Sequence, residues 1–82
     1  MKGQLTMLEC STGVTMSVIS DGKMLLFRTD STSNVAFLNG PNPDGTVDCG
    51  ALPAGGLPVS VMYRPLKREG IEGEPVIVQF QQ

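Results

Sequence analysis

The dipeptide Asp21-Gly22 constrains this chain more than any other feature of its sequence. It lies between two runs of strand-forming residues, Val14–Ile19 and Met24–Arg28. A two-residue type I′ turn needs positive φ at both central positions, and Asp-Gly adopts that conformation at little cost. Such a turn places Ser20 opposite Lys23 and thereby fixes the register of the whole hairpin.

This register sorts the side chains of the hairpin onto two faces, because successive strand residues point to opposite sides of a sheet. One face carries pairs of mainly apolar residues and is predicted to face the core. A one-residue slip would scramble this sorting. The pairs are Val18 with Leu25, Met16 with Phe27, and Val14 with Thr29.

A third strand, Gly3–Cys10, is predicted to precede the hairpin. Two loops can join it to Val14. A three-residue loop, Ser11-Thr12-Gly13 with Gly13 left-handed, pairs Leu8 with Met16 inside the domain. A two-residue loop would place Glu9 on the core face instead, so we favour the longer loop.

The second face of this three-stranded meander is unusually apolar for a solvated sheet. Either a further strand layer covers it, or it is a surface for contact with another protein or a second copy of the chain. The candidate contact residues are Leu5, Met7, Ile19, Met24 and Leu26.

The rest of the chain alternates short strands with turns. Strands are predicted at Val35–Leu38, Val59–Arg64 and Pro75–Gln82, whereas Pro41–Gly45 is typical of a turn and Pro65–Glu74 of a polar loop. No helical period is present. The pattern predicts one all-β domain over residues 1–82, with five to seven short strands. We expect a small closed or partly open antiparallel barrel, OB-like or SH3-like, with a small β-sandwich as the alternative.

Charge and hydropathy restrict the partners. Six basic and eight acidic residues give a net charge of −2, so no overall field draws the chain to phosphate backbones, which argues against nucleic acid. No apolar run approaches the roughly 20 residues that cross a bilayer. Met1-Lys2 leads straight into a predicted strand, so we expect no signal peptide.

Cys10 and Cys49 are the two cysteines of the chain. A disulfide between them would stabilise the fold by roughly 4 kcal/mol on the chain-entropy model. The alternative is two buried free thiols that pack as small hydrophobic groups. Both cysteines fall at predicted strand ends, where a small β-domain is often cross-linked.

One basic cluster follows a predicted strand and forms a candidate ligand patch, which consists of Tyr63, Arg64, Lys67 and Arg68. An OB-like barrel can use such a patch to hold a small ligand or single-stranded nucleic acid. Most of the few aromatic residues occupy core positions, however, and acidic residues follow the cluster at once. A solvated loop is therefore the simpler interpretation.

The sequence offers little for catalysis or cofactor binding. It has no histidine, so neither a cysteine–histidine pair nor a usual four-ligand zinc site can form. No glycine-rich phosphate loop leads into a helix. We therefore expect a non-enzymatic domain without catalytic residues, metal or cofactor.

Several short motifs spread along the chain are shared with a known type of domain. They are Gly3-Gln4-Leu5, Cys10, Val35-Ala36-Phe37, Cys49-Gly50, Tyr63-Arg64-Pro65 and Val76–Phe80. Together they resemble an uncharacterised small bacterial β-domain of acidobacterial type that often follows helical repeats. The segment Gly40–Pro58 is longer here than in that domain. The resemblance implies a role in binding or assembly, through protein contact or self-association, and it implies no catalytic residue.

Overall fold

The computed structural model of the chain describes residues 1–11, 13–52 and 56–81, with the backbone alone at 32, 51, 67 and 68. These residues form seven strands and one 3₁₀ turn, without an α-helix among them. The elements are β1 (Lys2–Glu9), β2 (Val14–Ser20), β3 (Lys23–Thr29), η1 (Thr32–Asn34), β4 (Ala36–Leu38), β5 (Gly50–Ala51), β6 (Leu57–Arg68) and β7 (Ile71–Phe80).

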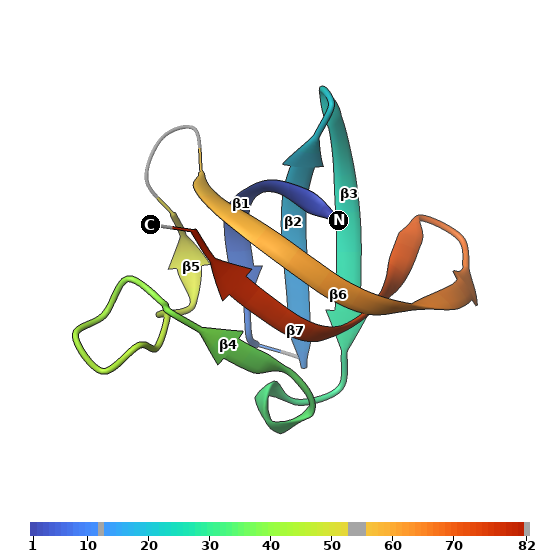
Figure 1. The fold of residues 1–82 in the computed structure, drawn as a ribbon. Coiled ribbons are helices and arrows are strands. Elements are labelled where there is room, and N and C mark those ends of the chain that lie inside the picture. The colour runs from blue at the N-terminus through green and yellow to red at the C-terminus, as the bar shows by residue number, and fades with distance from the viewer. Residues whose placement is uncertain (12, 53–55, 82) are drawn as a thin grey trace.

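Five of the strands close into a small barrel, as the sequence predicted. Their order is β2-β3-β7-β6-β1, and β1 also pairs with β2, which completes the circle. Figure 1 shows β6 and β7 crossing in front of β1, β2 and β3, so that the core lies between them. The pairs are antiparallel except for β3 with β7 and β4 with β7, which are parallel. The barrel is therefore mixed, and the prediction of a wholly antiparallel barrel is wrong in this respect. The short strands β4 and β5 extend the sheet beyond the barrel.

The β2–β3 hairpin has the register predicted from its turn. Ser20 lies opposite Lys23, and the pairing continues without a break to Val14 opposite Thr29. Asp21 and Gly22 both have positive φ, at 51° and 77°. These values are those of a type I′ turn, whose twist matches that of the flanking strands. A local turn signal therefore determines the longest unbroken ladder of the β1–β3 meander.

The prediction that Leu5 lies on the outer face is wrong. Its side chain is 0% exposed and belongs to the core. The reason is a β-bulge, because the β1–β2 register shifts between Leu5 and Met7. The extra residue, Thr6, reverses the alternation, so Leu5 and Leu8 point inward although three positions separate them. Leu8 lies opposite Met16, as the longer loop predicted.

The barrel closes where β3 meets β7. The parallel pair there is Phe27 with Gly73. A Cβ at Gly73 would lie 2.5 Å from the Tyr63 ring and 2.6 Å from the carbonyl oxygen of Arg64. Both atoms belong to β6, so glycine is required for β6 and β7 to approach so closely beside this junction.

The β6–β7 hairpin is longer than the sequence predicted. Pro65 does not end the strand but lies within β6, opposite Gly73, beside a register shift between Pro65 and Arg68. The irregular ladder at this shift accommodates a residue that lacks an amide donor. Most of the predicted Pro65–Glu74 loop is consequently strand, and the turn narrows to Glu69-Gly70.

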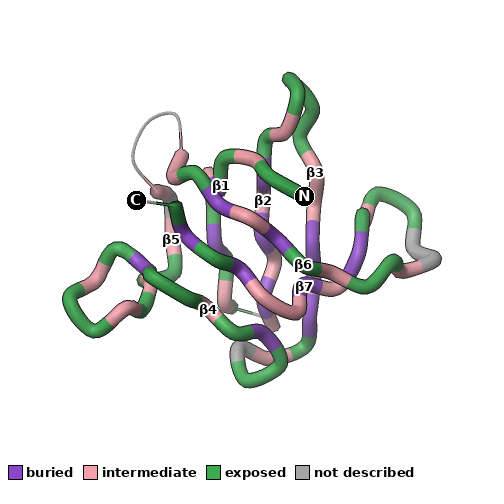
Figure 2. The backbone as a smooth tube through the Cα atoms, viewed as in Figure 1, coloured by how far each residue is buried: buried purple, intermediate pink, exposed green. Residues whose placement is uncertain are grey.

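The core fills the inside of the barrel. Buried positions alternate with more exposed ones along β2, as expected for a strand with one face inward (Figure 2). Register shifts interrupt this alternation in β1 and β7. Phe27 is packed edge-on against Tyr63, with ring centroids 5.0 Å apart. The buried apolar residues are Leu5, Leu8, Val14, Met16, Val18, Phe27, Val35, Val59, Val61, Val78 and Phe80.

Candidate functional site

The outer face of β1, β2 and β3 carries a group of neighbouring apolar side chains. We call Met7, Ile19, Met24 and Leu26 the contact surface. Ile19 lies opposite Met24, while Ser17 lies between Met7 and Leu26 in the next row. Met24 is 61% exposed, Met7 40% and Ile19 37%, and Leu26 is half-buried. Four of the five predicted contact residues thus share one exposed face.

No described strand covers this face. The barrel is closed by β6 and β7 on its far side, and β4 and β5 add to the edges of β7 and β1. The sequence left open whether a further strand layer covers these residues or they form a contact surface. Within the described part of the chain they meet solvent.

The contact surface ends at a polar row toward the other end of the strands. Thr15 lies opposite Glu9 on one side and Arg28 on the other. The Arg28 guanidinium donates a hydrogen bond to Thr15 Oγ1 at 2.7 Å. An apolar centre with a polar border is the arrangement found in protein interfaces.

The candidate ligand patch does not form an open binding surface where its side chains are described. Tyr63 is packed against Phe27 in the core. Arg64 is exposed and forms an ion pair with Glu74 at 3.0 Å, and Glu74 also accepts a hydrogen bond from Thr29 Oγ1. The side chains of Lys67 and Arg68 lie outside the described part of the chain.

The aromatic side chains all pack in the core or against it. The chain has three Phe and one Tyr. Phe27 and Phe80 are buried, and Phe37 and Tyr63 are half-buried against the core. Binding of single-stranded nucleic acid relies on exposed rings on which bases stack. The structure brings no such ring to the surface.

Cys10 and Cys49 are joined by a disulfide. The sequence left open whether the two cysteines form a disulfide or remain buried free thiols, and the structure has the disulfide. Cys10 follows β1 and is half-buried, while Cys49 precedes β5 and is exposed. The bond ties the long segment between β4 and β6 to the end of β1.

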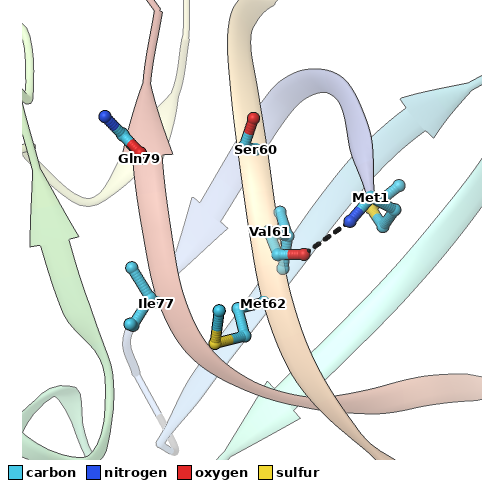
Figure 3. A pocket seen from close by; sticks show the side chains of 6 residues that line it. All are labelled: Met1, Ser60, Val61, Met62, Ile77 and Gln79. Carbon is cyan, nitrogen blue, oxygen red and sulfur yellow. Dashed lines mark hydrogen bonds between the residues drawn. The ribbon is translucent and has the colours of Figure 1, made fainter.

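Two shallow hollows lie outside the contact surface. The first, of about 270 Å³, is lined by Met1 and by residues of β6 and β7. Figure 3 shows Met62 and Ile77 side by side on these two strands. The terminal ammonium of Met1 donates a hydrogen bond to the Val61 carbonyl at 2.8 Å beside this hollow. The second, of about 360 Å³, lies between residues 39–43 and the strand ends at Leu57 and Phe80. Neither lining contains an ionisable side chain.

Among the described residues, no three His, Cys, Asp or Glu side chains are grouped so that they could hold a metal ion. Over the same residues, no helix has the length and hydropathy needed to span a membrane.

Sequence reasoning did not find the exposed Met62, which is 62% exposed on the far side of the barrel. Its outward position follows from the alternation of β6, in which Val59 and Val61 point inward. That alternation was visible in the sequence, so the signal was present.

The fold and surfaces together describe a closed five-stranded β-barrel with two short added strands, one disulfide and an exposed apolar face. The chain matches no protein-family model, no curated protein and no solved structure.

Proposed function

We propose that this domain is a non-enzymatic contact module that self-associates through the contact surface. The observation that carries the proposal is the exposure of Met7, Ile19 and Met24 on one face of a barrel that already has a complete core. The barrel does not need apolar side chains at these outer positions in order to fold. Their burial against a second copy would remove apolar surface from water.

The electrostatics near this face also support contact with a like copy. Glu9 and Arg28 flank the contact surface at one end, and Asp21 and Lys23 lie at the hairpin turn. Charges of both signs therefore border the apolar centre. Two copies related by a twofold axis can align opposite charges and need not repel each other.

We further propose that the barrel has the OB-like form. A meander of three strands is followed by a hairpin whose last strand lies parallel to the third, and this order supports the OB-like rather than the SH3-like alternative. In OB barrels the outer face of strands 2 and 3 is the usual binding face. The contact surface occupies that same face, with methionine and aliphatic groups where nucleic-acid binders present aromatic rings.

Sedimentation velocity over a range of concentrations tests self-association. The wild-type chain is expected to associate, and Ile19→Lys/Leu26→Lys is expected to weaken the association by at least about tenfold while the barrel stays folded. Met24→Lys has a matched control in Met62→Lys, because both are exposed strand methionines and Met62 lies outside the contact surface. A wild-type chain that stays monomeric throughout, or equal effects of Met24→Lys and Met62→Lys, would contradict the proposal.

A further inference from the structure

The segment between β4 and β6 reaches the barrel mainly through β5 and the disulfide. Gly50 and Ala51 of β5 pair with Leu8 and Met7 of β1. The amide of Leu52 donates a hydrogen bond to the Thr6 carbonyl at 3.1 Å. Figure 1 shows β5 beside β1. There β5 pairs with the part of the β1 edge that lies beyond the end of the β1–β6 ladder. The segment thus occupies one stretch of the β1 edge.

This stretch of edge begins where β6 stops pairing with β1. The β1–β6 ladder runs from Lys2 to Leu5 on β1 and goes no further. Beyond the bulge at Thr6, β5 takes over as the neighbour of β1. The backbone of β1 at residues 6–8 therefore needs a strand that the barrel itself does not supply.

Apart from the covalent bond, the described residues of the segment have short pairing and partial burial against the barrel. The strand β5 has two residues, and Val47 and Leu52 are only half-buried against the core. By contrast, β1 keeps its ladders to β2 and to β6 whether β5 is present or not. Local opening is expected where pairing is short and burial is partial.

We propose that the Cys10–Cys49 bridge is a redox-operated latch over a strand-acceptor edge. Reduction releases residues 39–52 from β1 and leaves the barrel closed. The free edge at residues 6–8 then takes β5 of a second copy, which forms a strand-exchanged dimer. The second copy is the occupant because its segment offers the backbone pairing and the Val47 and Leu52 side chains that already fit this edge.

The opening step is a thiol–disulfide exchange with a dithiol reductant. A thiolate of the reductant attacks Cys49 Sγ, because Cys49 is exposed whereas Cys10 is half-buried. The Cys10 sulfur leaves and takes a proton. The second thiol of the reductant then displaces the Cys49 sulfur, which is also protonated. Two electrons pass to the protein, and the reductant leaves as a cyclic disulfide.

Two single-cysteine chains test the exchange directly. Cys10→Ser retains only Cys49, and Cys49→Ser retains only Cys10. Both chains also carry Ile19→Lys/Leu26→Lys, which disables the contact surface. The dimers in this test therefore report strand exchange alone, whether or not the contact surface mediates self-association. The chains are mixed under mild oxidation with oxidised glutathione, and the disulfide-linked dimers are counted by mass spectrometry. Strand exchange predicts that dimers joining Cys49 to Cys10 far exceed the half that random collision gives, and a random mixture overturns it.

Hydrogen exchange of the two-cysteine chain, oxidised and then reduced with dithiothreitol, tests the latch. Residues 39–52 are expected to lose nearly all protection, whereas β2, β3 and β7 stay protected, with a loss of at most about a thousandfold from the unfolded-state entropy that the bridge removes. Unchanged protection of the segment would show that the bridge does not hold it. Loss of nearly all protection in β2, β3 and β7 as well would show that the bridge holds the whole barrel, and either result overturns the latch.

Discussion

The β1–β3 meander and the crossover segment between β3 and β6 are held in place by different interactions. The meander has long ladders, a tight turn and side chains that alternate between core and solvent. The crossover has two short strands, a 3₁₀ turn and one covalent bond to the barrel. In the meander each local preference agrees with the final fold, whereas the crossover depends on distant contacts.

The crossover has local order of its own near its tip. Gly40 donates a backbone hydrogen bond to Gly45, and Asn42 to Thr46. The Asn42 side chain also contacts Thr46 and Asp48. These are contacts within the segment, so they shape the loop without fixing it to the barrel. Turns thus provide the local shape of the crossover, whereas its attachment to the barrel needs β4, β5 and the disulfide.

The largest expected effect compares one phenylalanine from each region. Phe27 on β3 is fully buried, whereas Phe37 on β4 is half-buried. Phe27→Ala is expected to lower the free energy of unfolding by about 3–5 kcal/mol, and Phe37→Ala by roughly half as much. Urea unfolding followed by circular dichroism measures both. Equal losses would mean that the crossover is as much a part of the core as the meander.

A smaller effect concerns Asp44 at the tip of the crossover. The hydroxyl and the amide of Thr46 both donate hydrogen bonds to Asp44 Oδ1, and they hold the pKa of this carboxyl below its ordinary value of 3.8. Because the folded pKa is lowered, the stabilisation is present above the ordinary value and is lost as the pH falls through the lowered one. The loop should therefore loosen only in acid.

An NMR titration of Asp44 in the wild-type chain and in Thr46→Val checks this contact. The variant removes the hydroxyl donor and keeps the amide, so the pKa of Asp44 should rise part of the way toward 3.8. If the pKa of Asp44 is the same in both chains, the hydroxyl bond does not lower it, and the contact within the loop is not formed in solution.

The sequence was sufficient for the β2–β3 register, because a two-residue turn and an alternating pattern each determine it independently. The sequence did not predict the burial of Leu5, since the apolar pattern gives no sign of the β-bulge at Thr6. It was insufficient for Pro65 as well, because the irregular ladder that accommodates this proline depends on the facing strand. The parallel pairing of β4 with β7 joins residues far apart in the chain, which no local signal specifies.

The candidate site residues divide in the same way, into those set by local sequence and those set by contacts with other strands. Ile19, Met24 and Leu26 lie on the hairpin whose register was fixed, and all three face outward as expected. The two described side chains of the ligand patch form no open binding surface, because Tyr63 packs against Phe27 and Arg64 pairs with Glu74. The first contact is long-range, and the second is a cross-strand pair of the β6–β7 hairpin. Local pattern thus predicted which residues lie outside, whereas tertiary contacts decided which of them are available.

The proposed self-association requires that the core does not need the contact surface, and two neighbouring residues of β2 test this most directly. Val18 is fully buried and Ile19 is exposed. By urea unfolding at a protein concentration where the wild-type chain is monomeric, Ile19→Lys should change the free energy of unfolding by no more than about 0.5 kcal/mol, whereas Val18→Lys should lower it by more than about 3 kcal/mol. If Val18→Lys does not fold, Val18→Ala replaces it with an expected loss of about 2 kcal/mol. An Ile19→Lys chain as destabilised as its Val18 counterpart would contradict the account.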